Sequence, residues 1–115
     1  MRQNHRPGAV VLVNFPFTDL QSSKVRPALV ISSKGEDVII LGIFSRVPDQ
    51  IRESWIKVDS HLDGFSQTGL KKMSIIKSEK ITVIHKSLIR KQLGTLPAEL
   101  LEHVRRVLLK TLEIN

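Results

Sequence analysis

Arg26 is the first residue of the 115-residue chain whose position points to chemistry, because it stands between a polar segment and Pro27. An apolar run typical of a strand begins directly after it. At the rim of a sheet, its guanidinium would present five fixed donors that suit the geometry of a phosphate. From position alone, an ordinary salt bridge at the sheet rim is the simpler explanation.

Lys77 and Glu79 form a second candidate group. If the chain is extended there, residues two apart share a face, and their backbones lie roughly 6.6 Å apart. A base and an acid at that separation can straddle one phosphodiester. The alternative is a solvated pair at a strand bend, and the spacing alone favours it.

Two aromatic residues can stack on nucleobases, a contact worth about 1–3 kcal/mol in single-strand binders. Phe44 belongs to an apolar run, so a core position competes strongly with this interpretation. Trp55 follows Arg52, Glu53 and Ser54, and for it the two interpretations are balanced.

Composition narrows the class of partner. Eighteen Lys and Arg against eleven Asp and Glu give a net charge of +7, which favours nucleic acid first and an acidic protein second. The absence of cysteine excludes disulfides and thiolate metal sites, and the four histidines lack metal-ligand spacing, so neither a metal nor a cofactor is predicted. No apolar run is long enough for a bilayer span, and the start lacks a secretory signal, so we expect a cytoplasmic protein without membrane contact.

Apolar patterning predicts the elements that must position these residues. Strands are expected over 9–15, 26–33 and 38–45, with an exposed loop at 16–25 and a hairpin turn at 34–37. Because it lacks an N–H, Pro27 is expected at the beginning of its strand or on a sheet edge. An edge strand is expected over 54–59, and a strand with a bend or bulge at 77–80 over 74–85.

Residues 96–114 carry apolar side chains at three- and four-residue spacings, with Pro97 near the first turn, and predict a helix. Five or so strands followed by one helix indicate a mainly β protein. We expect a single domain over 1–115, built as a small curved antiparallel sheet or barrel capped by the helix.

The ordered segments "GAVVLVNFPFTDL", "KVRPALVISS", "VIILGIFSR", "GLKKMSIIKSEKITVI" and "LGTLPAELLEHVRRVL" resemble the MazF/PemK family of toxin ribonucleases from bacterial toxin–antitoxin systems. The resemblance covers roughly Gly8 to Leu112. It implies an SH3-like barrel of the PemK/MazF/CcdB type that forms a homodimer and cuts single-stranded RNA without metal. The products would be a 2′,3′-cyclic phosphate and a 5′-hydroxyl, and an acidic antitoxin peptide would occupy the RNA groove.

The resemblance also implies roles for residues. Arg26 matches the arginine of the family's Arg-Pro pair and would stabilise charge on the scissile phosphate. Lys77 falls on an arginine of the PemK branch and would act as phosphate ligand or acid. Glu79 falls on an aspartate of that branch and would act as general base. Many members have a threonine hydroxyl where this chain has Phe44. Ser45, one residue further, is the candidate substitute, although a shift of one turns a side chain to the other face of a strand.

Further RNA contacts are expected from two cations and the two aromatic residues. These candidates are Lys24, Phe44, Arg46 and Trp55. Phe44 at the expected hydroxyl position supports an alternative, a catalytically weakened or inactive member that binds RNA or antitoxin. A toxin directed at DNA gyrase is a third possibility on a related fold, and no residue specifically favours it.

Overall fold

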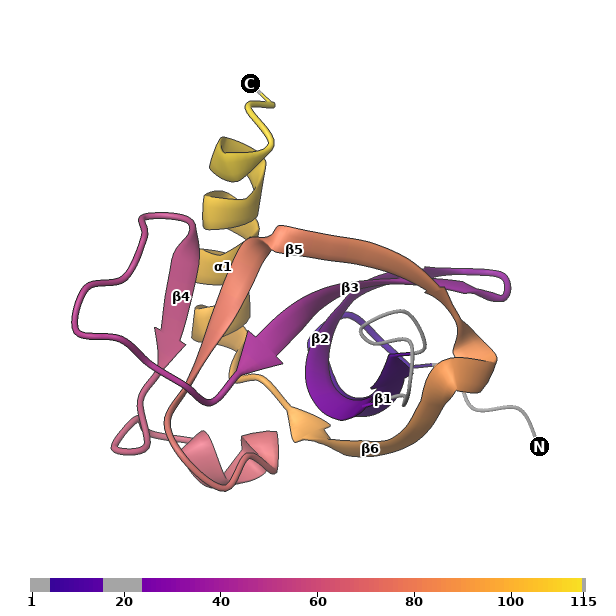
Figure 1. Ribbon diagram of the computed structural model, residues 1–115, viewed down its shortest axis with the longest axis horizontal. Helices are drawn as coiled ribbons and strands as arrows, with labels where there is room; N and C mark the ends of the chain where they lie inside the picture. The colour runs from indigo at the N-terminus through magenta and orange to yellow at the C-terminus, as the bar shows by residue number, and fades with distance from the viewer. Residues whose placement is uncertain (1–4, 16–23, 115) are drawn as a thin grey trace.

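Six antiparallel strands and a C-terminal helix make up this computed structural model, which describes residues 5–15 and 24–114 (Figure 1). The strands are β1 (Ala9–Phe15), β2 (Lys24–Lys34), β3 (Asp37–Phe44), β4 (Trp55–Val58), β5 (Ser74–His85) and β6 (Ile89–Thr95). The helix is α1 (Ala98–Thr111), and two short 3-10 helices are η1 (Phe65–Thr68) and η2 (Lys86–Leu88). The predicted mainly β class with a C-terminal helix is confirmed.

The strands form one sheet in the order β4-β5-β3-β2-β1-β6, and it curls strongly on itself (Figure 1). β1 is buried on both faces, as its apolar sequence predicts. Val10 belongs to the core under the helix, while Val11 and Val13 belong to a second core that also holds Ala28 and Ile40. The curl therefore gives the sheet two apolar interiors and leaves polar chemistry to its rims.

Helix α1 packs against β4 and β5 through Val104 and Leu108, which are buried in the first of these cores. Glu99 in the first turn and Lys110 in the last turn complement the helix dipole. The helix predicted over 96–114 is thus confirmed. No helix among the residues described here is long and apolar enough to cross a membrane.

The β2–β3 hairpin has the predicted antiparallel pairing, and it opens at one end. Its pairing begins only at Ala28 opposite Gly42, whereas β1 still pairs with Pro27 through Leu12. The expectation for Pro27 is therefore wrong in part, because it lies in the fourth position of an inner strand. Its missing N–H is tolerated since this part of β2 lacks a partner on the β3 side. Of the predicted loop 16–25, Lys24 and Val25 instead belong to β2, where they pair with β1, and residues 16–23 lie outside the described part of the chain.

β5 contains the expected bulge. Lys77 pairs with Gly42 and Ile81 pairs with Leu41, so residues 78–80 have no partner on β3. β4 pairs only with the first half of β5 and forms one edge of the sheet, as predicted. β6 forms the other edge and was not predicted from the sequence.

Candidate functional site

Two adjoining hollows form where β2 and β3 separate. Their volumes are about 430 and 580 Å³, and both are lined by Arg26, Phe44 and Lys77. We call the two together the basic cleft. The cations that line it are Lys24, Arg26, Arg46, Lys77 and Lys80. No carboxylate occurs among the described residues that line it, so this described lining is positively charged.

Phe44 lies between the principal cations of the basic cleft. The guanidinium carbon of Arg26 lies 5.9 Å from the ring centroid, and Nζ of Lys77 lies 4.4 Å from it. Gly42 makes this ring position possible, because a Cβ there would lie 3.0 Å from two carbons of the Phe44 ring. A glycine two residues earlier on β3 thus leaves room for the ring against the strand.

Ring contacts leave the positive charge of these side chains available. An aromatic face attracts a cation through its quadrupole but carries no net charge. Among the described residues, neither Arg26 nor Lys77 takes part in an ion pair. The two cations are therefore held in place without being neutralised, which suits a site for an anion.

Trp55 forms the second aromatic wall around Lys77. It pairs with Lys77 across the β4–β5 ladder, and Nζ of Lys77 lies 4.4 Å from the centroid of the indole ring. The same ammonium thus contacts two aromatic rings, one from β3 and one from β4. Two attachments from different strands restrict a side chain that is otherwise flexible.

Glu79 is bound by three donors. Nε1 of Trp55 donates to its Oε2 at 2.7 Å, Oγ of Ser54 donates to Oε1 at 2.6 Å, and Nη1 of Arg52 donates to Oε2 at 2.9 Å. Partial burial raises the pKa of this carboxyl, but the hydrogen bonds from Ser54, Trp55, its own backbone and Arg52 outweigh burial and lower the pKa to about 2. The group is therefore ionised throughout the neutral range.

The predicted site residues fall into two groups. Seven of the eight line the basic cleft, namely Lys24, Arg26, Phe44, Ser45, Arg46, Trp55 and Lys77. Glu79 does not line it and reaches it only through the indole of Trp55. Ser45 is exposed just beyond the end of β3. The convergence of cations was predictable, and the catalytic roles of these residues stay predictions.

Sequence reasoning missed Arg52 and Ser54 as partners of Glu79, and Lys80 as a residue of the basic cleft. The two donors lie 27 and 25 residues before Glu79 in the chain, so no local pattern connects them. Lys80 lies in the bulge of β5, where the alternation of an extended strand no longer gives the direction of a side chain. Their proximity could have been predicted only from the pairing register between β4 and β5.

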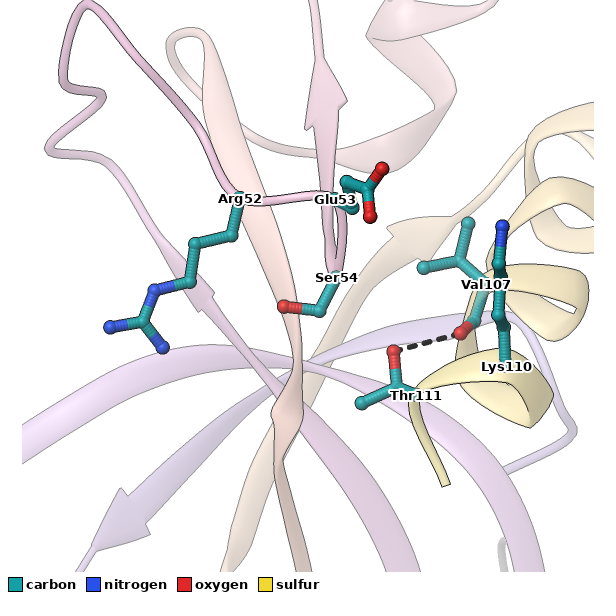
Figure 2. A pocket seen from close by; sticks show the side chains of 6 residues that line it. All are labelled: Arg52, Glu53, Ser54, Val107, Lys110 and Thr111. Carbon is teal, nitrogen blue, oxygen red and sulfur yellow. Dashed lines mark hydrogen bonds between the residues drawn. The ribbon is translucent and has the colours of Figure 1, made fainter. Parts of the chain in front are cut away.

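A separate hollow of about 570 Å³ lies between residues 52–54 and helix α1 (Figure 2). The side chains of Arg52 and Ser54 point away from the helix, while Glu53 points toward it. Thr111 donates to the carbonyl of Val107 within the helix at 2.8 Å. This hollow shares no lining residue with the basic cleft.

In the described residues, no group of three or more His, Cys, Asp or Glu could hold a metal ion.

Residues 6–112 match the family model of PemK-like, MazF-like toxins of type II toxin–antitoxin systems. No curated protein matches the chain.

Solved structures share the fold at low sequence identity. The MazE–MazF complex from Deinococcus radiodurans is 21% identical, covers 99% of this chain and 100% of its own, and has a TM-score of 0.77. A mycobacterial endoribonuclease in complex with its cognate antitoxin is 13% identical, with coverage of 97% and 98% and a TM-score of 0.74. The toxin MazF-mt6 of Mycobacterium tuberculosis is 15% identical, with coverage of 93% and 98% and a TM-score of 0.72.

Proposed function

Because the chain belongs to the family of PemK-like, MazF-like toxins of type II toxin–antitoxin systems, we propose that it cuts single-stranded RNA without a metal ion. One observation carries this proposal. Arg26 of β2 and Lys77 of β5 lie on the Phe44 ring in a cleft whose described lining contains no carboxylate. Two fixed and unpaired cations are what a phosphodiester requires for charge stabilisation.

The reaction would be an internal transfer at phosphorus. The 2′-oxygen attacks the phosphorus atom as its hydroxyl loses a proton, the bond from phosphorus to the 5′-oxygen breaks, and that oxygen takes up a proton. A 2′,3′-cyclic phosphate and a 5′-hydroxyl result. Arg26 offers paired N–H donors to the phosphate oxygens, and Lys77 adds a positive charge close to them.

Glu79 fits a positioning role better than the role of general base. A carboxylate whose pKa is about 2 is a weak proton acceptor at neutral pH, and both of its oxygens already accept hydrogen bonds. Its bond to the indole N–H fixes the Trp55 ring, which in turn contacts Lys77. The 2′-hydroxyl proton then passes to solvent, and catalysis rests on the two cations.

Other residues of the basic cleft would bind the strand around the scissile bond. Lys24, Arg46 and Lys77 would attract phosphates, and Trp55 would stack on a base. Ser45 would donate a hydrogen bond to the substrate. An acidic antitoxin would compete with RNA for the same charges, as the antitoxin complexes of similar folds suggest. Homodimer formation and a cytoplasmic location complete the proposal.

The direct test is cleavage of single-stranded RNA by pure protein in excess chelator. We expect discrete fragments ending in 2′,3′-cyclic phosphate and 5′-hydroxyl, identified by mass spectrometry. Arg26→Ala should abolish them, and Lys34→Ala, which changes an exposed lysine at the far end of β2, should not. If the wild-type protein leaves the RNA uncut, or if Arg26→Ala cuts as well as wild type, the nuclease proposal fails.

A second candidate is a member of the family that binds RNA without cutting it. It is favoured by Phe44, which occupies the position expected of a hydroxyl and carries the two cations. This candidate predicts RNA binding that weakens steeply with salt while the substrate stays intact. Observed turnover that depends on Arg26 would eliminate it.

A further inference from the structure

A second group of cations lies beside the basic cleft. Lys71 and Lys72, from the segment between η1 and β5, and Lys91 of β6 line a hollow of about 310 Å³. Its described lining includes no carboxylate, and none of the three lysines forms an ion pair within the described chain. The fold therefore holds three like charges around one hollow, and no described residue of the lining carries a compensating charge.

Two glycines fix the lysine-bearing segment against β6. Gly69 has a φ of +76°, and a Cβ on it would collide with the carbonyl oxygen of Leu93. A Cβ on Gly94 would likewise collide with the carbonyl oxygen of Gln67. These close approaches require glycine on both sides. The backbone that carries Lys71 is thus held directly against the strand that carries Lys91.

The buried Thr68 adds a second constraint on this segment. Its hydroxyl donates to the carbonyl of Phe65 at 2.7 Å and accepts from the N–H of Leu70 at 3.1 Å. Backbone positions are therefore set before any ligand arrives, which lowers the entropic cost of binding. Only the lysine side chains remain to be ordered.

The hollow adjoins the basic cleft around the rim of the sheet. Pro27 and Ser45 line this hollow, and each also lines part of the basic cleft. Leu12 of β1 pairs with Pro27 on one side and with Lys91 on the other, so Lys91 lies two strand spacings, about 10 Å, from Pro27. Neighbouring residues of a strand face opposite sides, so Arg26 faces away from its neighbour Pro27. Arg26 and the three lysines therefore lie on either side of the same rim of the sheet.

We propose that Lys71, Lys72 and Lys91 bind a phosphate that flanks the scissile phosphate of the same RNA strand. This inference rests on the proposed function and adds a second binding site to it. Lysine ammonium groups bind phosphates as mobile point charges, without requiring one orientation of the strand. An RNA that passes Ser45 at the rim would place successive phosphates first in the basic cleft and then among the lysines.

Length dependence of RNA binding provides the test. Fluorescein-labelled, uncleavable 2′-O-methyl RNA of randomised sequence, either 2 nucleotides long with a single phosphate or 12 nucleotides long, is titrated and followed by anisotropy. The variant Lys71→Gln/Lys72→Gln/Lys91→Gln should bind the 12-mer about tenfold more weakly, and its log affinity against log salt should flatten by about 0.7 for each phosphate that the variant no longer binds. Binding of the 2-mer, whose single phosphate can occupy the basic cleft without a flanking one, should stay within about twofold of wild type.

The matched control is Lys34→Gln/Lys57→Gln/Lys110→Gln, which removes the same charge from exposed lysines outside both sites. It should affect both lengths equally and weakly. Equal loss in the control, or equal loss for both lengths, would overturn the second site while leaving the nuclease proposal intact. So would unchanged RNA affinity with lost self-association by light scattering, since the lysines would then serve a protein contact. If wild type binds neither length and cuts no RNA, the proposed function itself fails.

Discussion

Arg26 and Arg52 both lie against an aromatic ring, yet their charges meet different surroundings. The guanidinium of Arg52 lies 5.4 Å from the centroid of Trp55 and donates to Glu79 at 2.9 Å. The guanidinium of Arg26 lies 5.9 Å from the centroid of Phe44 and has no ion pair with any described residue. The charge of Arg52 on the Trp55 ring is thus neutralised, whereas the charge of Arg26 on the Phe44 ring is not.

The difference separates a supporting region from a binding region. Around Trp55, the three side chains that donate to Glu79 form hydrogen bonds inside the protein, so this region holds the Trp55 ring in position. Around Phe44, the rings hold Arg26 and Lys77 in place without consuming their charge. Lys77 contacts both rings and connects the two regions.

The sharpest way to break this comparison is to remove each arginine in turn. Arg26→Ala should reduce RNA cleavage by about 100- to 1,000-fold, because it removes charge stabilisation at the reacting phosphate. Arg52→Ala should reduce cleavage only about two- to fivefold, since its exposed ion pair contributes little. Initial rates on one RNA substrate decide between them, and equal losses would contradict the division into two regions.

The next largest effect is expected from Gly42→Ala. The new methyl would lie 3.0 Å from two carbons of the Phe44 ring, so the ring must move and carry Arg26 and Lys77 with it. A displacement of this kind should lower kcat by about 10- to 100-fold. Phe44→Leu, which lacks the ring, serves as the control background, and there the added methyl should cost less than about threefold. A full additional loss in that background would mean that Gly42 acts independently of Phe44.

The supporting region can be tested by a double-mutant cycle. Trp55→Phe keeps a ring for Lys77 but loses the donor to Glu79, and Glu79→Gln keeps the shape but loses the charge. Each should weaken binding of uncleavable RNA about three- to tenfold, and the double variant should be no worse than either single one. A loss of about 1,000-fold in kcat for Glu79→Gln, with RNA binding unchanged, would instead identify Glu79 as the general base.

The smallest effect concerns acid stability. The pKa of Glu79 is lowered from its ordinary 4.5 to about 2, so its contribution to stability is complete above pH 4.5 and is lost as the pH falls toward 2. Glu79→Gln should therefore lower the free energy of unfolding by about 1–3 kcal/mol at pH 7. The difference from wild type should vanish near pH 2 in denaturant titrations. A constant difference from pH 7 to pH 2 would contradict the lowered pKa.

The fold was largely predictable because most strands carry β-branched runs. The exception is β6, whose sequence "IRKQLGT" has exposed or half-buried side chains throughout and no clean alternation. An edge strand that pairs on one side needs little apolar surface, so periodicity could not detect it. Pro27 was misplaced for a related reason, since a strand can be inner along one stretch and unpaired on one side along another.

Within the candidate site, the sequence predicted which charged side chains converge but not which contacts hold those side chains in position. The spacing of Lys77 and Glu79 allowed a joint action on one phosphate but by itself favoured a solvated pair, and the resemblance implied the joint action. The structure instead has Glu79 at the edge of the Trp55 indole and Lys77 over its face. Contacts between β3, β4 and β5 decide this, and they depend on register and on the bulge at 78–80, which no local pattern specifies.

The aromatic supports of Arg26 and Lys77 have a consequence for acidic surroundings. Phenyl and indole rings do not ionise, so their attraction for a cation is the same in mildly acidic and in neutral solution. The basic cleft also has no histidine among its described lining residues. The positive charge of its described lining should therefore be the same in mildly acidic and in neutral solution, and RNA affinity should change little over that range.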